Sequence, residues 1–380
     1  MSQTKVEAPF VEGVGGGFKN VIINGDMQIF QRATSATTIP SSGYSTVDRF
    51  GFSEGSGGAA TSELDNLSVA DQATTGQARA IELNCTTADT SIAAGDRSYM
   101  FYNIEAQDCR RFLYGTSAAQ TLTLSFWAKS SLTGNFPLTI KKDDNTVYYL
   151  PLSYSISSAN TWEKKTITWT PTEGSTSLIT ASGGAINNDN GRGFQIFWGL
   201  MWGSNYTGSQ SGTPTWTSSA YFADSDITFV NFYDSTSNNL YITGVQLEVG
   251  DAASDFEHLP HDVQLARCKR YFENYELESG SGLLGLSFNA DDATCRLEYK
   301  ITKRLAPTIG GLTAAQSGTG MSFLTNAGSY SSSAGSLASH SISIDGCRIN
   351  GSSQGNLNNP GASILYATGD NTITIDAEIG

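Results

Sequence analysis

Charged side chains are scarce in this sequence, and basic ones are the scarcest. Only 15% of the 380 residues are charged, and 22 Lys and Arg stand against 36 Asp and Glu, which gives a formal net charge of −14. Proteins that bind nucleic acid or anionic membrane need a basic footprint that neutralises phosphate. The charge balance therefore predicts no nucleic-acid partner and no anionic membrane partner.

Histidine is rarer still, and this limits the catalytic chemistry open to the chain. The histidines are His258, His261 and His340, so no Ser-His-Asp or Cys-His site can be built from the residues before them. Pro260 between the first two keeps them off one helical face, and the sequence offers no third ligand for zinc. We expect packing roles for both, no catalytic residue, no metal site and no cofactor.

Paired cysteines and long apolar runs are also missing. The five cysteines are odd in number, without a Cys-x-x-Cys spacing, and scattered: Cys85, Cys109, Cys268, Cys295 and Cys347. They predict buried free thiols in a protein made in a reducing cytoplasm. No long apolar stretch occurs, and Met1 is followed by no basic and then apolar segment. We therefore expect neither membrane insertion nor a secretory signal peptide.

Glycine, aromatic residues and alternating polar and apolar positions are abundant. The chain contains 40 glycines and 11% aromatic residues, a composition typical of short strands joined by turns. Leu122, Leu124 and Phe126 alternate with threonine and serine, so they share one face of a strand. Turn clusters of Gly, Asp and Asn separate similar stretches. This pattern predicts an all-β chain built from antiparallel sandwiches.

Composition divides the chain into four parts: an arm (1–19), a first β-domain (20–258), a connecting helix (259–273) and a smaller second β-domain (274–380). The arm is rich in glycine, which is typical of a segment that becomes ordered on a partner. In the connecting segment, Leu265, Cys268 and Phe272 fall at helical spacing. This apolar stripe predicts a short amphipathic helix that packs either between the domains or against a neighbouring subunit.

Two groups of aromatic residues differ in their expected roles. Strand alternation puts one group on a single face, which is typical of a core: Phe194, Ile196, Trp198, Leu200 and Trp202. Loops rich in glycine, serine and threonine hold the candidates for ligand contact: Tyr206, Trp216, Tyr221 and Tyr330. Rings in such loops can stack on sugars, although for Trp216 the sequence favours a buried loop anchor. The loop around Tyr330 is either a recognition surface or a connector.

Carboxylates keep an enzymatic alternative open. A glycoside hydrolase needs two of them across a groove, and the candidates by residue type are Asp65, Asp71, Asp89, Asp96, Asp143, Asp144, Asp189, Asp224 and Asp226. Most stand in turn contexts, where aspartate accepts hydrogen bonds from turn amides. Nothing in the sequence selects a pair, and a structural calcium ion stays an alternative use for them.

Several motifs resemble, in order, those of a family of bacteriophage tail-fibre and other virion proteins. The segments NVIINGDMQIFQR (20–32) and YSTVDRF (44–50) are similar to the family's N-x-x-x-N-G-x-F-x-x-W-Q-R and Y-x-A-D-R-W. The further matches are TLSFWAK (123–129), TWEKKT (161–166), TPTW (213–216), LYITGVQLEVG (240–250), DFEHLP (255–260), CKRYFE (268–273) and IDAEI (375–379). The resemblance covers residues 20–275 and the extreme C-terminus. Met27, Phe30 and Phe50 depart from it by apolar exchanges.

The resemblance implies a jelly-roll sandwich similar to carbohydrate-binding modules, a connecting helix, a small C-terminal β-domain and a homotrimer. The motif residues also have a physical interpretation. Asp48 and Arg49 are expected to form ion pairs or backbone hydrogen bonds that hold the strand after them. Gln246 and Glu248 alternate with aliphatic residues, so we expect them on a solvated face of a strand.

Charge and resemblance together predict a non-enzymatic virion fibre or appendage on the exterior of the particle, made in the host cytoplasm. Its expected partners are itself, a bacterial surface glycan, and another virion protein. The candidate residues for virion attachment are Pro9, Phe10, Val11, Val14 and Phe18. A capsid or tail decoration protein without receptor binding is the structural alternative, and a polysaccharide depolymerase is the enzymatic one.

Overall fold

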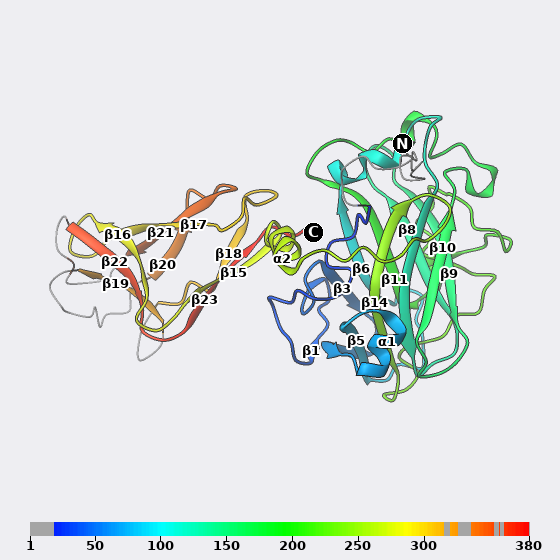
Figure 1. Ribbon diagram of the computed structural model, residues 1–380, viewed down its shortest axis with the longest axis horizontal. Helices are drawn as coiled ribbons and strands as arrows, with labels where there is room; N and C mark the ends of the chain where they lie inside the picture. The colour runs from blue at the N-terminus through cyan, green and yellow to red at the C-terminus, as the bar shows by residue number, and fades with distance from the viewer. Residues whose placement is uncertain (1–18, 315–319, 326–335, 353–356, 358–360, 380) are drawn as a thin grey trace, which may run out of the picture.

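The computed structural model describes residues 19–314, 320–325, 336–352, 357 and 361–379. Figure 1 shows a large β-sandwich and a narrower second β-domain, with helix α2 (His261–Lys269) between them. From here on, "the arm" means this second domain, and residues 1–19 are called the N-terminal arm. The C-terminus lies beside α2 and not at the far end of the arm, so both connections of the arm meet at its base. The attachment residues proposed from the sequence lie outside the described residues: Pro9, Phe10, Val11, Val14 and Phe18.

Two six-stranded antiparallel sheets form the first sandwich. The first sheet has the order β1 (Thr37–Thr38), β4 (Ala59–Asn66), β5 (Arg79–Thr87), β14 (Asn239–Val249), β7 (Leu122–Ser130) and β10 (Glu163–Trp169). The second has the order β2 (Gly43–Tyr44), β3 (Phe50–Gly55), β6 (Arg97–Glu105), β11 (Arg192–Trp202), β8 (Gly134–Lys142) and β9 (Tyr148–Ile156). This layout confirms the predicted jelly-roll β-sandwich.

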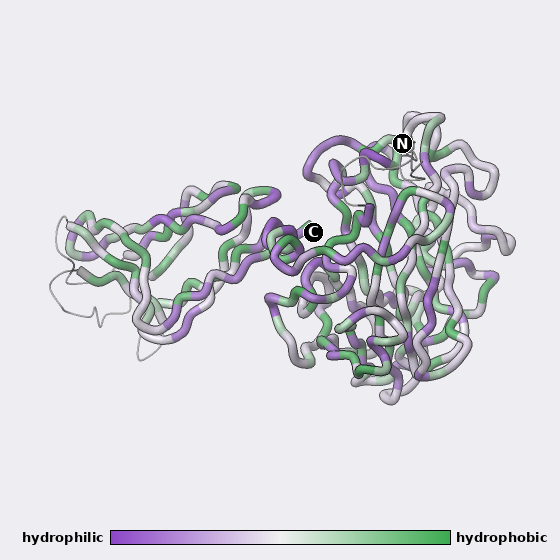
Figure 2. Tube along the Cα trace, in the orientation of Figure 1, coloured by the Kyte–Doolittle hydropathy of each residue, from purple (hydrophilic) through white to green (hydrophobic). Residues whose placement is uncertain are grey.

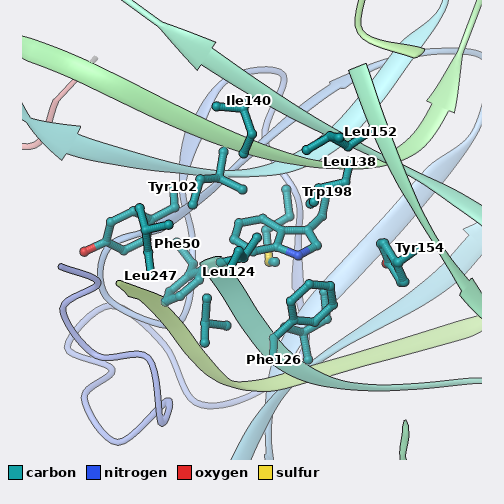
Figure 3. Packing of buried hydrophobic residues seen from close by; sticks show 14 of the residues in the cluster. Phe50, Tyr102, Leu124, Phe126, Leu138, Ile140, Leu152, Tyr154, Trp198 and Leu247 are labelled. Atoms are coloured by element: carbon teal, nitrogen blue, oxygen red, sulfur yellow. The ribbon is translucent and has the colours of Figure 1, made fainter. Parts of the chain in front are cut away.

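The inner faces of these sheets bury one continuous apolar core. Leu122, Leu124 and Phe126 point into it from β7, as the alternation predicted. Figure 3 shows Trp198 of β11 at its centre, and the ring centroids of Trp198 and Phe126 are 5.9 Å apart. Each large apolar side chain buried here contributes roughly 1.5–3 kcal/mol. Core burial is therefore the main term that stabilises the sandwich.

Short elements connect the strands of the sandwich. They are α1 (Val69–Thr75), the 3-10 helices η1 (Ala106–Phe112), η2 (Glu173–Ser175), η3 (Ser182–Gly184) and η4 (Ser204–Tyr206), and the parallel pair β12 (Thr207–Gly208) and β13 (Ala223–Asp224). Helix α1 begins where Ser68 Oγ accepts the Asp71 amide at 3.1 Å, and ends where Gly76 adopts a φ of 71°. Within the described ranges, no helix has the length and apolar character that a bilayer crossing requires.

The polar side of β14 is buried, so the expectation of a solvated face is wrong. Gln246 and Glu248 are 0% and 6% exposed. Glu248 accepts the amide and hydroxyl of Ser254 at 2.9 and 2.6 Å, and Gln246 donates to the Asp255 carbonyl at 3.3 Å. Lys19 donates to Ser254 Oγ at 2.7 Å. The segment that leads out of the sandwich therefore folds back over its last strand, a contact that alternation cannot reveal.

Helix α2 is shorter than predicted, because Phe272 already belongs to the following strand. Its Cys268 is buried in a cluster with Ile379. Its buried Gln264 donates to Asp26 Oδ1 at 2.9 Å. These contacts place α2 between the first sandwich and the base of the arm, which is one of the two packing alternatives that the sequence left open.

The arm is a smaller and unequal sandwich, as the sequence predicted. Its large sheet has the order β19 (Met321–Thr325), β22 (Gly361–Ala367), β16 (Gly282–Ser287), β17 (Ala293–Glu298), β21 (Gly346–Ser352) and β20 (Ser336–His340). The smaller sheet has the order β15 (Phe272–Leu277), β23 (Asn371–Asp376) and β18 (Thr308–Gly310). Leu297, Ile349 and Ile373 belong to the core between them.

A buried ionic network joins the first sandwich to the end of the chain. Arg49 is 1% exposed, pairs with Glu378, and donates to the Asn103 carbonyl at 2.6 Å. Its guanidinium carbon lies 3.5 Å from the ring centroid of Tyr271, a cation–π contact. Arg32 lies 3.4 Å from the same Glu378 carboxylate. Arg49 thus has the predicted ion pair, with a partner 329 residues away along the chain.

Further polar contacts surround α2 and the base of the arm. Glu105 accepts from Arg270 Nη2 at 2.7 Å and from the Tyr271 hydroxyl at 2.8 Å. Lys303 and Glu273 form a pair at 2.6 Å in which neither side chain is exposed. A buried pair of this kind is costly to break, because one charge stays behind without a partner. The base of the arm is therefore a fixed joint.

Candidate functional site

The outer face of the second sheet carries the largest group of aromatic side chains outside the two main cores. Strand register arranges them, since Phe101 of β6 lies opposite Phe197 of β11, and Phe197 lies opposite Thr139 of β8. We call this group the aromatic face: Tyr44, Tyr99, Phe101, Phe197, Trp202, Tyr206, Phe222 and Phe229.

A β-bulge in β11 brings Trp202 onto this face. The pairing of β11 with β6 shifts between Gly199 and Met201, so Met201 joins the core and Trp202 points outward. The prediction that Trp202 lies on the core face with Trp198 is therefore wrong. An inserted residue reverses the alternation after it, and nothing in the local sequence marks its position.

Two glycines let rings lie close against the sheet. A Cβ atom at Gly199 would stand 2.2 Å from Trp202 Nε1, and one at Gly51 would stand 2.3 Å from the Phe101 ring. Both distances are far below carbon contact distance, so only glycine admits these ring positions. The backbone of the sheet thus forms a floor on which the aromatic side chains rest.

Trp202 is the centre of the stacked rings. Tyr99 stacks on it with centroids 5.0 Å apart and planes 18° apart, and Phe222 does so at 4.6 Å and 24°. Tyr206 approaches at 5.9 Å with a tilted ring. Trp202 itself is only 9% exposed, whereas Tyr99, Tyr206 and Phe222 are half-buried. These three rings carry the ring surface that meets solvent.

The long loop before β14 holds its part of the site by backbone hydrogen bonds. The Phe222 amide donates to the Tyr206 carbonyl at 2.7 Å, and the Phe222 carbonyl accepts from Thr139 Oγ1 at 2.5 Å. The Tyr221 ring lies against Gly208, where a Cβ atom would stand 2.4 Å from it. The loop is therefore fixed to the sheet on both sides of Phe222.

A pocket of about 350 Å³ opens beside the stacked rings. Its lining is mainly apolar and includes Trp202 and Phe229, while Asp224 is its one charged side chain. Asp224 Oδ1 accepts the amides of Gln210 and Asp226, both at 3.0 Å, so this carboxylate fixes the loop. The volume falls within the range of small-molecule sites, about 300–1,000 Å³.

A row of polar side chains crosses the same sheet face next to the rings. Gln195 donates to Asn103 Oδ1 at 2.5 Å, and Lys141 donates to Gln195 Oε1 at 3.0 Å. Burial lowers the pKa of Lys141, and the Asp143 carboxylate at 2.7 Å opposes this. Asn103 donates to the Ile379 carbonyl at 2.6 Å. The row therefore connects the aromatic face to the end of the chain.

Two of the four predicted ligand-contact residues lie in this region. Tyr206 belongs to the aromatic face, and Tyr221 lies in the same loop, directly before Phe222 and with its ring against Gly208. Trp216 lies elsewhere, is 1% exposed, and donates its indole N–H to the Thr170 carbonyl at 3.0 Å. It is the loop anchor that the sequence left as an alternative, and its ring is not available for stacking on a ligand. Tyr330 lies outside the described residues.

Sequence reasoning missed Tyr99, Trp202 and Phe222. One signal was present in β6, where Tyr99 and Phe101 alternate with the core residue Tyr102 and its neighbours. Aromatic residues on both sides of a strand indicate that its second face also meets something other than water. No comparable local signal marked the other two residues, since their positions depend on a bulge and a long loop.

The candidate carboxylates mostly serve turns, as their sequence context indicated. Asp89 accepts the amides of Gly57 and Ser91, both at 3.0 Å, and Asp96 accepts that of Ala93 at 2.6 Å. Among the residues that the structure describes, no three His, Cys, Asp or Glu side chains gather closely enough to hold a metal ion.

Lys142, the last residue of β8, is surrounded by three backbone carbonyls. Its ammonium donates to the carbonyls of Asp144, Thr146 and Gly183 at 2.8, 3.0 and 2.8 Å. Burial lowers the pKa of Lys142 to about 8, against the attraction of neighbouring carboxylates. A side-chain cation therefore ties two loops together at this point.

The comparisons with known proteins give similarity in structure alone. No protein-family model matches the chain, and no curated protein matches it in sequence. One match is a provisionally assigned sugar-binding protein from Bacteroides thetaiotaomicron. The alignment covers 61% of this chain and 100% of that protein, with 11% identity and a TM-score of 0.33. The family 11 carbohydrate-binding module of a Clostridium thermocellum cellulase covers 59% and 99%, with 10% identity and a TM-score of 0.28. Likeness at this level identifies no ligand.

Proposed function

We propose that this chain is a bacteriophage virion protein, a non-enzymatic homotrimeric tail fibre or appendage on the exterior of the particle. The aromatic face contacts a glycan of the bacterial surface during adsorption. Residues 1–19 attach the chain to another virion protein. No cofactor, nucleic acid or membrane insertion takes part.

The motifs that carry the family resemblance support the proposal, because their residues serve one common fold. Asn20 Oδ1 accepts the Leu247 amide at 3.0 Å. Asn24 donates to the carbonyls of Ile29 and Asp48 at 2.7 and 3.0 Å. These hydrogen bonds connect the first motif to the second and to the GVQLEVG strand. The matched residues thus lie together in one structural unit.

The stack of Tyr99, Trp202 and Phe222 beside a pocket is the observation that carries the glycan contact. Aromatic rings offer flat apolar surfaces to the C–H faces of sugars, and nearby polar groups meet the hydroxyls. Arg97 lies over Tyr206 at 5.4 Å and places donors at the rim. Because the chain carries a net charge of −14, contact with anionic bacterial surfaces has to depend on stacking and hydrogen bonds. Several copies would multiply weak single contacts.

Binding of purified full-length protein to an array of bacterial surface polysaccharides tests this proposal. Tyr99→Ala removes a half-buried ring from the stack, and we expect at least about tenfold weaker binding, or about 1.4 kcal/mol. Tyr241→Ala is the matched control, since Tyr241 is a half-buried strand tyrosine on the outer face of the other sheet. The control should bind as the wild type does. Wild-type protein should also compete with phage particles for adsorption.

Equal losses in both variants, or no competition at saturating protein, would overturn the glycan contact. That result, with the chain still present in particles, would favour a decoration protein. Release of reducing sugar from a polysaccharide by the wild type would contradict the non-enzymatic assignment. Each outcome is measured on the same purified protein.

Attachment through the N-terminal arm has its own test. Deletion of residues 1–18 should abolish incorporation into particles, because all five attachment candidates lie in this segment. The circular dichroism spectrum and the melting temperature should stay unchanged, because Lys19, which the variant keeps, is held on the sandwich by Ser254. Incorporation that persists in the deletion variant would place the attachment elsewhere.

A further inference from the structure

The outer face of the large sheet of the arm is apolar across three adjacent strands. Leu284 is 82% exposed, Leu286 59%, Phe288 54% and Ile364 41%. Leu284 lies directly opposite Ile364, and Ile364 lies opposite Leu324. We call this surface on β16, β22 and β19 the arm stripe: Leu284, Leu286, Phe288, Leu324, Ala362 and Ile364.

The stripe lies in the part of the arm away from the first sandwich. Figure 1 shows β16, β22 and β19 together near the far end, and Figure 2 shows hydrophobic positions along the same strands. The opposite side of these strands faces the arm core, where Phe323 and Leu365 are fully buried. The three strands therefore carry apolar side chains on both faces, which is typical of strands that are covered on both sides.

Exposed apolar residues scattered singly need no explanation, but a contiguous row does. Soluble proteins rarely leave such patches open, because apolar area removed from water contributes roughly 25 cal/mol per Å². The second sandwich thus has a covered inner face and an open apolar outer face. A partner molecule is the physical means of covering it.

The lack of charge in the arm stripe suits a second copy of this chain as that partner. Two copies that each carry −14 repel one another overall, so a contact between them has to lie where neither places a charge, and the arm stripe contains no ionisable side chain. Charges begin on the next strands of the same face, where Arg296 forms a solvent-exposed pair with Glu298 at 3.2 Å and lies opposite Arg348. The stripes of two copies can therefore meet without burying an unpaired charge.

The size of the face sets how much of it takes part in such a contact. Three strands at about 4.8 Å spacing, and about six residues at about 3.3 Å each, give the stripe roughly 14 by 20 Å, or about 290 Å² in plan, and the whole six-stranded face about twice that. Standard interfaces bury roughly 800 Å² of accessible surface per partner. The stripe is therefore the apolar part of a contact that also takes in neighbouring parts of the sheet.

We propose that copies of this chain associate through the arm stripe. The location of the contact follows from the exposed row, whereas the number of copies, three, rests on the proposed function. The first sandwich then stays free at the other end of each copy, with its aromatic face away from the contact. Association at the arm and glycan contact at the sandwich are therefore separable.

Sedimentation equilibrium of the full-length protein, over about 0.1–50 μM, tests this assignment. Leu284→Glu places a carboxylate in the middle of the stripe, and we expect the dissociation constant of the assembly to rise at least about 100-fold. Val69→Glu is the matched control, because Val69 is 84% exposed on α1 in the first domain and the charge change is the same. The control should assemble as the wild type does. Thermal melts establish that both variants fold.

Leu284→Ser is a milder second variant, with an expected rise of about tenfold, should the glutamate variant fail to fold. A wild type that stays monomeric over the whole range would overturn both the stripe and the homotrimer. An assembly that Leu284→Glu leaves intact would overturn the stripe alone and leave the homotrimer standing. A wild type that assembles but binds no glycan would count against the proposed receptor contact and not against the stripe.

Discussion

The two sandwiches of this chain both bury their inner faces, but they differ in how far their outward side chains are covered. In the first, six strands face six, and segments of the protein itself cover several outward side chains. Ser254 and Asp255 cover Gln246, and Phe222 covers Trp202. In the arm, six strands face three, and Leu284 stays 82% exposed. The first sandwich completes itself, and the arm is left incomplete.

The difference teaches that strand alternation settles only which residues share a face. Whether an outward face meets a loop, water or a partner depends on the lengths of the connections. The long loop between β11 and β14 supplies Phe222 to the first sandwich. The half-buried rings of the aromatic face and the exposed apolar side chains of the arm stripe both follow from these connection lengths.

The largest effect on stability is expected at the joint, where Arg49 of the first sandwich pairs with Glu378 at the base of the arm. Arg49→Ala should lower the free energy of unfolding by about 3 kcal/mol, because the buried Glu378 keeps only Arg32 as a cation and the Asn103 carbonyl loses its donor. Denaturant unfolding followed by tryptophan fluorescence measures the change. Arg296→Ala is the control, since its pair with Glu298 is exposed, and it should cost less than about 1 kcal/mol. Equal costs would mean that the joint does not couple the domains.

The joint should also make stability depend on pH. Burial raises the pKa of Asp48 to about 6, against the opposing effects of Arg32 and Gln31. The unfolded chain, with a value of 3.8, holds that proton less tightly. Unfolding free energy should therefore fall as pH rises from about 4 to about 6, by up to about 3 kcal/mol at about 1.4 kcal/mol per unit.

Asp48→Asn should flatten this part of the stability profile, because the asparagine does not titrate. Asp291→Asn, at an exposed position, should leave the slope unchanged. Denaturant titrations at half-unit pH intervals give the slopes directly. An Asp48 variant with the wild-type slope would show that another group at the joint is responsible.

One added methyl group should disturb the aromatic face without unfolding the sandwich beneath it. Gly199→Ala forces a Cβ atom into the space of Trp202, so we expect a loss of about 1–3 kcal/mol and an altered near-ultraviolet dichroism of the stacked rings. Gly95→Ala is the control, since a Cβ atom there would meet nothing within 4 Å. An unchanged dichroism spectrum in the first variant would contradict the flat ring position.

The smallest effect compares the two sandwiches directly. All five cysteines are free and buried, as predicted, and burial raises the pKa of Cys295 to about 12. Such thiols do not react until their surroundings open. We expect Cys295 and Cys347 of the arm to be alkylated at lower denaturant than Cys85 and Cys109, because the arm core is covered by a smaller sheet. Peptide mass spectrometry resolves each site, and the reverse order would make the arm the more stable domain.

The sequence predicted the fold class well, because it depends on local patterns. Alternation placed Leu124 and Phe126 in the core, and the same periodicity identified two β-domains around a helix. It misplaced Trp202, because one extra residue at a bulge reverses the faces of a strand. It also misjudged Glu248, because a segment that returns over a strand leaves no periodic trace.

The candidate site was predicted only in part, for a related reason. Tyr206 stood in a loop whose composition indicated recognition, and it does belong to the aromatic face. Trp216 had the same sequence context and is buried instead. Composition describes a loop as a whole, whereas exposure depends on where each residue meets the sandwich. Residue type alone could not separate the two.

By itself the sequence determined the all-β fold class and the shortage of basic residues, since each depends on residue type and short-range order. Only the tertiary structure decided which residues meet across long distances. Arg49 pairs with Glu378 at the far end of the chain, Trp202 stacks on Phe222 across a loop, and Leu284 stays 82% exposed. Side-chain burial is a property of surfaces that close in space, and surfaces close between segments that the order of residues keeps apart.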